Sequence, residues 1–161
     1  MTIPNLLQAG APTKLNFTCQ AAEIPPSTIG TINVPYFGRM IPYPGDRHFS
    51  PWRVGIINDE DFIVRDAMEN WHTNINSREG NIRTVSSDDP NLVMGTAIVT
   101  QYGRTGASNI LRQYTFQHIW PSQIAGIELN WSQQDTIEQF PVEFNYAWWD
   151  VTGNTVNGNA S

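Results

Sequence analysis

Apolar and polar residues alternate along much of this chain, and a period of two predicts β-strands. The clearest case is FPVEFNYAWW, residues 140–149, where the apolar residues at even positions would share one face. Tyr114, Phe116, His118 and Trp120 share a face in the same way within residues 111–120. Further strands are predicted at residues 5–9, 52–57, 96–102 and 127–131.

One segment follows the helical period instead. Val64, Ala67, Met68, Trp71 and Ile75 fall on one face of a helix, and charged residues face away from it. The acids at positions 59–61 precede this helix, where the positive end of its dipole favours negative charge. Asn58 is the predicted N-cap. The acidic cluster therefore has an explanation that requires no metal.

Many strands with one helix predict a mainly β fold, an antiparallel β-sandwich or partly open barrel with the helix on its flank. A length of 161 residues fits a single domain. We place that domain at residues 1–150. The last eleven residues, 151–161, lack apolar periodicity and are expected to form a flexible polar tail.

Charge argues against nucleic-acid binding. The formal net charge is −6, Lys14 is the only lysine, and the eight arginines are scattered. A protein that binds nucleic acid through its phosphates carries a basic patch or stripe, which this sequence lacks. Charged residues make up only 15% of the chain, so much of its surface is expected to be neutral and polar. Such a surface suits repeated contacts between subunits.

Catalytic and metal-binding motifs are missing from the sequence. His48, His72 and His118 lie far apart, and the single cysteine, Cys19, allows no intrachain disulfide. Gly103 and Gly106 are too isolated for a phosphate-binding loop. We therefore predict no enzyme activity, no cofactor and no metal. Neither a signal peptide nor a long apolar run supports secretion or a membrane anchor.

Trp148 and Trp149 are adjacent, so on one strand they must point to opposite faces. The even-position pattern puts Trp148 inside. Trp149 is then the predicted outward aromatic, a candidate interface residue.

The segment IPYPGDRHFSPWRVGIINDEDFIVRDAMENW, residues 41–71, resembles tail tube proteins of contractile-tailed, T-even-like bacteriophages. The resemblance extends from about Pro4 to Asp150. It includes PNLLQA near the start, a Gly-Arg pair at 38–39, Gly-Asp-Arg at 45–47, Trp-Pro at 120–121 and the closing aromatic strand. No single motif is specific, but their order over most of the chain is.

This resemblance implies a structural subunit. Such proteins form hexameric rings that stack into a hollow tube, and part of each sheet contributes to a continuous inner barrel. The implied partners are copies of the chain itself, a tail sheath protein, a baseplate hub and a tape measure protein. DNA would pass through the lumen without specific binding. The implied location is the virion, with assembly in the cytoplasm of the bacterial host.

Stacking requires a projecting element, and residues 36–48 are the candidate. This segment combines turn formers, aromatic residues and charges that could set the register between rings. The candidate inter-ring residues are Tyr36, Phe37, Arg39, Tyr43, Asp46, Arg47 and His48. The alternative for the segment is an ordinary hairpin loop.

Two other functions stay open at this point. One is a tube subunit of a secretion or injection system. The other is a monomeric carbohydrate-binding β-sandwich that uses some of the six tryptophans to stack on sugar rings.

Overall fold

The computed structural model describes residues 11–82, 93–104, 110–128, 130 and 137–152. The predicted strand at residues 5–9 lies outside this part of the chain. The elements, in chain order, are α1 (Ala11–Thr18), β1 (Cys19–Ala22), β2 (Ser27–Tyr36), β3 (Arg39–Phe49), β4 (Trp52–Ile57), α2 (Ile63–Ile75), β5 (Gly95–Tyr102), β6 (Ile110–Ile124), β7 (Gln139–Asn145) and β8 (Trp148–Thr152).

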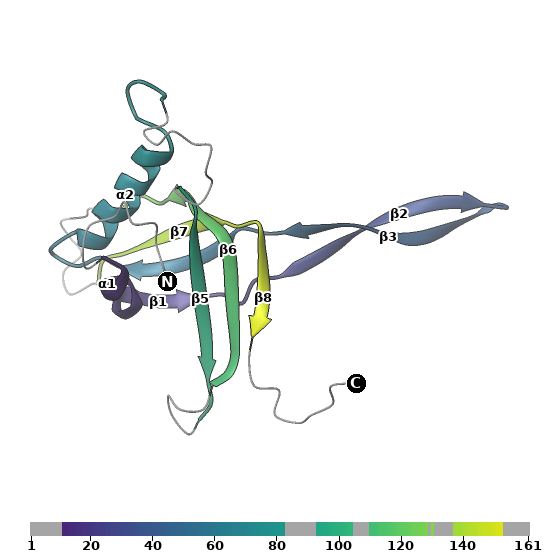
Figure 1. Cartoon of the computed structure of the whole chain (residues 1–161), viewed down its shortest axis with the longest axis horizontal. Helices are drawn as coiled ribbons and strands as arrows, with labels where there is room; N and C mark the ends of the chain where they lie inside the picture. The colour runs from purple at the N-terminus through teal and green to yellow at the C-terminus, as the bar shows by residue number, and fades with distance from the viewer. Residues whose placement is uncertain (1–10, 83–92, 105–109, 129, 131–136, 153–161) are drawn as a thin grey trace.

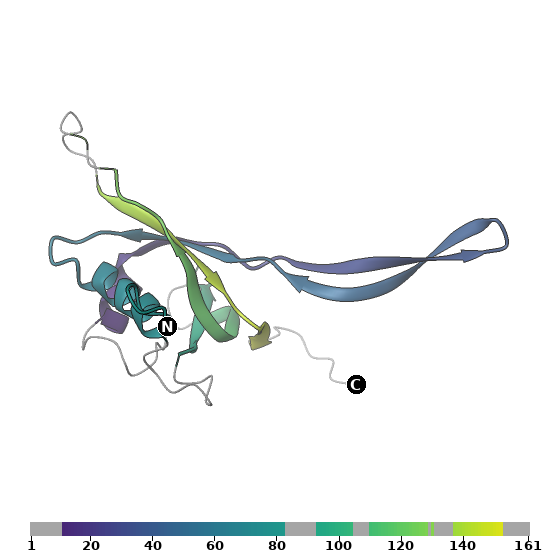
Figure 2. The ribbon, with the colours of Figure 1, turned by 90° about the horizontal axis from the view of Figure 1, so that it is seen from above.

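One curled antiparallel sheet makes up the body, in the order β1-β4-β7-β6-β5. The 15-residue strand β6 pairs first with β8 and then with β7 along the same edge, which bends the sheet into a half-barrel (Figures 1 and 2). The predicted mainly β fold with a flanking helix is confirmed. Strands β2 and β3 form a separate two-stranded sheet that extends away from the body.

The core lies between the concave face of this sheet and the two helices, which lie on one side of it in Figure 2. Alternation along β7 buries Phe140, Val142 and Phe144, as predicted. From α2 come Val64, Ala67, Met68 and Trp71, also as predicted. The Trp71 indole donates a hydrogen bond to the Val93 carbonyl at 2.7 Å, so its polar atom is satisfied.

Several sequence predictions are wrong in detail. Helix α1 is not predicted, because it is short and buries a single described side chain, Leu15. Asn58 is not the N-cap, since α2 begins five residues later and the Asn58 amide donates to the Glu138 carboxylate instead. Residues 127, 128 and 130 form no strand, and Leu129 and Trp131 lie outside the described residues. Both edges of β7 are already taken by β4 and β6.

The predicted face of β6 changes part-way along the strand. Tyr114 and Phe116 are buried, but beyond them the buried residues are Ile119 and Pro121. His118 adopts a left-handed backbone conformation with φ 54°, which interrupts the alternation. Its ring lies half-buried against Trp148, at 5.0 Å between centroids, so His118 does not share the buried face of Tyr114 and Phe116 that the pattern predicts for it.

The packing of α2 yields a stability prediction. Trp71→Ala should lower the free energy of unfolding by about 3–5 kcal/mol, because it leaves a large cavity and removes the indole hydrogen bond. Trp148→Ala is the matched control, since 43% of that side chain is exposed, and it should cost about 1 kcal/mol. Chemical denaturation measures both variants. Equal losses would contradict the assignment of Trp71 to the core.

Candidate assembly surfaces

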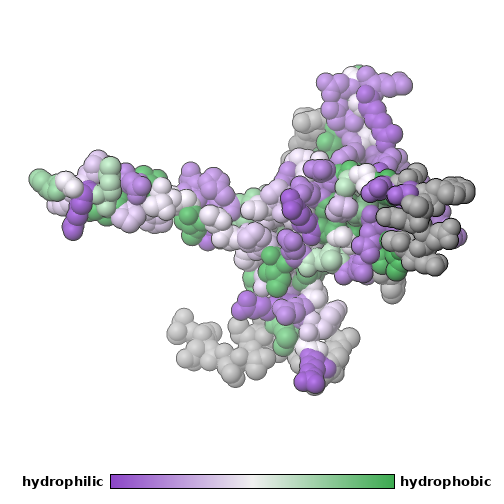
Figure 3. Space-filling view, turned by 180° about the vertical axis from the view of Figure 1, so that it is seen from behind, coloured by the Kyte–Doolittle hydropathy of each residue, from purple (hydrophilic) through white to green (hydrophobic). Residues whose placement is uncertain are grey.

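The most prominent feature outside the body is a long β-hairpin, β2 and β3 with their turn, which we call the arm (residues 27–49). It extends away from the body in every view (Figures 1–3). Its strands join through a two-residue turn at Phe37 and Gly38, with φ of 43° and 81°. Positive φ at both positions matches the twist of a hairpin and is unstrained at Gly38.

The arm has two different faces. The register pairs Ile32 with Tyr43, Val34 with Ile41 and Tyr36 with Arg39. Directly opposed side chains share a face. One side, the apolar face, therefore carries Ile32, Val34, Tyr36, Ile41 and Tyr43, with Arg39 next to the turn. The other face carries Thr31, Asn33, Pro35, Met40, Pro42 and Pro44.

Prolines block the edges of the arm. In a two-residue hairpin the closing pair, here Tyr36 and Arg39, exchanges hydrogen bonds, and the following pairs alternate. Pro35, Pro42 and Pro44 then fall in non-hydrogen-bonded pairs, where backbone N–H groups point outward. Because proline has no N–H, the outer edge of β3 loses two donors and that of β2 loses one. The arm is thus poorly suited to gain a further strand, and its faces are left for contact.

A bulge separates the outer half of the arm from its base. The register shifts between Ile29 and Thr31, where Gly30 faces two residues, Gly45 and Asp46. The backbones approach closely here: a Cβ on Gly45 would lie 3.2 Å from the Gly30 carbonyl oxygen. Glycine at both positions permits this approach and the local twist of the ribbon.

Nothing in the described chain covers the apolar face. Tyr36, Tyr43 and Ile32 are each more than half exposed, and Phe37 at the turn is 92% exposed. A two-stranded ribbon has no core of its own and is marginally stable in water. Large exposed apolar patches mark interaction sites. The arm therefore has the properties of a surface that another molecule covers.

The predicted contact residues all lie on the arm, but they do not form one cluster. Tyr36, Phe37, Arg39 and Tyr43 occupy its outer half, whereas Asp46, Arg47 and His48 lie at the bulge and base. No ion pair holds Arg39 or Arg47 within the described residues. The contribution of β2 was not predicted, although Ile32 and Val34 alternate in step with Tyr36 and could have signalled it.

The predicted orientation of Trp149 is wrong. Residues 146 and 147 interrupt the strand between β7 and β8 and reverse the alternation. Trp149 therefore packs inward, with its ring 5.7 Å from that of Tyr114, while Trp148 is 43% exposed. Burial raises the pKa of the nearby Tyr146 hydroxyl above its ordinary value.

A second candidate surface is the convex side of β5, β6 and β8. The registers align nine residues in three rows across these strands, and Asp150 is the single charged residue among these nine. Six of the others are threonine or glutamine. Within the described chain, β5 and β8 each pair only with β6, so each has a free edge. The rows are Thr96–Gln117–Trp148, Ile98–Thr115–Asp150 and Thr100–Gln113–Thr152.

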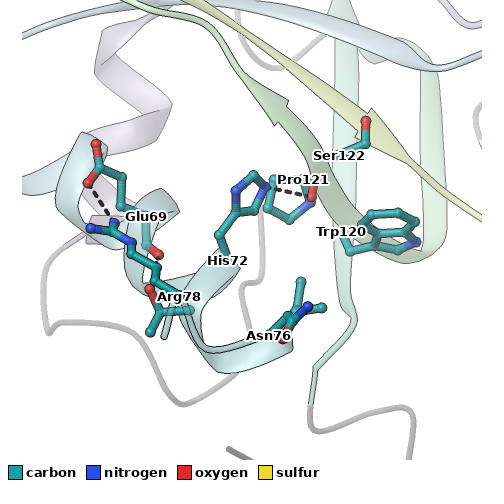
Figure 4. A pocket seen from close by; sticks show the side chains of 9 residues that line it. Glu69, His72, Asn76, Arg78, Trp120, Pro121 and Ser122 are labelled. Carbon is teal, nitrogen blue, oxygen red and sulfur yellow. Dashed lines mark hydrogen bonds and ion pairs between the residues drawn. The ribbon is translucent and has the colours of Figure 1, made fainter. Parts of the chain in front are cut away.

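A pocket of about 340 Å³ beside the end of α2 contains residues that could suggest catalysis (Figure 4). Their hydrogen bonds are structural. His72 Nε2 lies 2.9 Å from the Pro121 carbonyl oxygen, so this nitrogen carries the hydrogen and donates. Ser122 Oγ donates to the Glu143 carbonyl oxygen at 3.1 Å rather than to a base. The pocket holds no nucleophile paired with a base.

Glu69, at the rim of the same pocket, is held between two arginines. Arg65 and Arg78 each lie 3.0 Å from one of its carboxylate oxygens. Partial burial alone would raise the pKa of this carboxyl, but the bonds from Arg78 and Arg65 outweigh it and keep the pKa below its ordinary value. Among the described residues no group of three or more His, Cys, Asp or Glu could bind a metal. No described helix is long and apolar enough to span a membrane.

Lys14 fixes α1 to the loop that precedes α2. Its Nζ lies 2.7 Å from an Asp59 carboxylate oxygen and 2.6 Å from one of Asp61. Hydrogen bonds with Asp59 and Asp61 raise the Lys14 pKa, and the Lys14 bond lowers the pKa of Asp59. This contact accounts for the acidic residues before α2 without a metal. It holds α1 beside the open side of the half-barrel.

The comparisons with known proteins agree with this arrangement. The model of the family "Phage tail tube protein" matches residues 3–152. This chain belongs to the phage tail tube protein family. Tail tube protein gp19 of Enterobacteria phage T4 is 28% identical over 150 residues, covering 91% of this chain and 90% of that protein. The tail tube protein of Serratia phage KSP90 is 29% identical over 122 residues, covering 76% of this chain and 66% of that protein.

Solved structures show the same fold at low identity. The tube-terminating cap of the anti-feeding prophage matches with a TM-score of 0.64 at 10% identity, covering 84% of this chain and 80% of that one. The sheath/tube terminator of an extracellular contractile injection system matches with a TM-score of 0.63 at 9% identity, covering 84% of this chain and 85% of that one. Because the chain belongs to the phage tail tube protein family, it is a structural component of a phage tail and not an enzyme. Family membership also favours a tube subunit over a carbohydrate-binding module.

The Lys14 contact predicts a pH-dependent contribution to stability. The lowered pKa of Asp59 means that its contribution is present above the ordinary value of 3.8 and is lost as pH falls through the lower folded-state value. The raised pKa of Lys14 means that its contribution is present below 10.5 and is lost above the folded-state value. Lys14→Gln should therefore melt below the parent protein at neutral pH and match it in strong acid. A melting difference that stays constant across this range would contradict the assignment.

Proposed function

We propose that this protein forms hexameric rings that stack into the inner tube of a contractile phage tail, with the arm of each subunit reaching the next ring. The observation that most supports this proposal is the arm, an extended ribbon with an uncovered apolar face and edges blocked by proline. Such an element gains stability only when another molecule covers its face.

Ring closure follows from the edges of the body. Free edges at β5 and β8 can meet around a ring through a head-to-tail contact that closes by rotation. Closure removes exposed edges that would otherwise promote aggregation. The convex side of β5, β6 and β8 would then line the channel.

The same surface suits the passage of DNA. Among its nine residues none is basic, and Asp150 adds a negative charge. Electrostatic affinity for DNA comes from lysine and arginine side chains that neutralise its phosphates, so a wall of threonine and glutamine offers DNA no electrostatic site. The net charge of −6 points the same way. Transit without retention is the property that a DNA conduit requires.

The remaining partners follow from a tube inside a contractile tail: a sheath protein around it, a baseplate hub at one end and a tape measure protein within. Assembly would take place in the cytoplasm of the bacterial host. The relatives by sequence named above are phage proteins, which favours a phage tail over a secretion or injection system.

Two arginines on the arm test the stacking role. Arg39→Ala with Arg47→Ala should leave the subunit folded, because both side chains are exposed and bind no described carboxylate. Electron microscopy of the purified variant should show single rings or none, since the charges that set the register are gone. The matched control is Arg53→Ala with Arg78→Ala, two arginines off the arm that are about two-thirds exposed. Normal tubes from the arm variant, or equal loss in the control, would overturn the stacking assignment.

A further inference from the structure

A groove of about 510 Å³ opens on the concave side of the half-barrel. It lies between the two ends of the main sheet, β1 and β5, whose outer edges are unpaired within the described chain. Leu15 and Cys19 line it on one side, Trp52 and Val54 form its floor, and Val99 and Tyr102 line the β5 side. None of its thirteen lining residues is charged.

The groove and the apolar face of the arm are complementary in chemistry. Both are mainly apolar, both lack acids, and Arg39, the single charge on that face of the arm, lies next to the turn. The blocked edges leave the arm to dock by a face rather than by adding a strand. A volume of about 510 Å³ can take several side chains, so residues such as Tyr36 and Tyr43 fit its scale.

The arm cannot fill the groove of its own subunit. It leaves the body in the opposite direction from α1 and β1, which border the groove, in both ribbon views (Figures 1 and 2). At about 3.3 Å per residue, its ten- and eleven-residue strands hold the turn about 30 Å away. A contact between arm and groove must therefore join two copies. Since each copy carries both parts, the contact is head-to-tail and can repeat from copy to copy, as a stack requires.

We infer that the apolar face of the arm of one subunit docks in the groove between β1 and β5 of a second copy. This inference rests on the proposed stacking function and names its acceptor. Ile32, Val34 and Tyr43 face the groove, while Met40 and the prolines on the other face stay outside it. Helix α1, held by Lys14, forms one wall.

The only cysteine of the chain lies in this groove, which provides a direct test. A second cysteine at Tyr43→Cys or Tyr36→Cys should form a disulfide with Cys19 of the next copy in assembled protein. Burial raises the pKa of the Cys19 thiol, so the oxidation is run at alkaline pH. Because every copy carries both partners, non-reducing electrophoresis should show a ladder of multimers. A disulfide requires Cα atoms within about 7 Å, so the ladder reports contact.

Two controls make the result specific. Met40→Cys places the thiol on the opposite face of the arm at similar exposure and should give no ladder. Adding Cys19→Ser to Tyr43→Cys should reduce the ladder to dimers at most. As a second readout, Tyr102→Glu at the groove should reduce tube formation at least tenfold. Ile82→Glu, at an exposed residue that follows α2 and belongs to neither the arm nor the groove, should leave it unchanged.

Each contrary outcome has one meaning. Tubes without a ladder from either tyrosine position would overturn the groove as the acceptor and leave the stacking function intact. Failure of the parent protein to assemble under any condition would overturn the stacking function, and this inference with it. If residues 1–10 of the same chain covered the groove, Cys19 would resist alkylation equally in the isolated subunit and in tubes, which would also overturn the inference.

Discussion

A two-stranded ribbon cannot bury its own apolar side chains, and the rest of this structure follows from that constraint. The body buries most of its large aromatic residues in a core: the sheet packs on α2, and Trp71, Phe116, Phe140 and Phe144 are almost fully buried. The arm does the opposite and exposes Ile32, Tyr36 and Tyr43 to water. An uncovered apolar face of this kind marks an interaction site, which is what the proposed assembly requires.

The body and the arm also have separate roles: the body provides the stability of the fold, and the arm provides the specificity of the proposed assembly. Phe49 at the base of the arm contacts Tyr146, and beyond this residue no ring contact joins the arm to the described residues of the body. Changes on the outer arm should therefore alter assembly with little effect on the fold of the body. Proline and glycine support this division. Pro42 and Pro44 prevent unwanted strand pairing, while Gly38 and Gly45 allow the turn and the bulge.

Local periodicity made the mainly β fold, α2 and its buried face predictable. The strand from Trp52 to Ile57 was also correct at both ends. Resemblance of ordered motifs along the chain supplied the family. Two of the failures depend on breaks in periodicity that one or two residues cause. His118 with positive φ moves the buried positions along β6, and the interruption at residues 146 and 147 exchanges the roles of Trp148 and Trp149.

The assembly surfaces were only partly predictable, for a related reason. Residues 36–48 stood out through their turn formers and charges, but the face of the arm depends on the register between β2 and β3 and on the bulge at Gly30. The groove depends on which strands end the sheet, and Leu15, Trp52 and Tyr102 are far apart in sequence. Such long-range geometry leaves no local signature.

The most direct test of this account is electron cryomicroscopy of the purified protein after incubation at high concentration. The account predicts hollow six-fold tubes in which the arm of every subunit lies against the adjacent ring and its apolar face is covered. Tubes whose arms project uncovered into solvent, or that stack through another element, would contradict it.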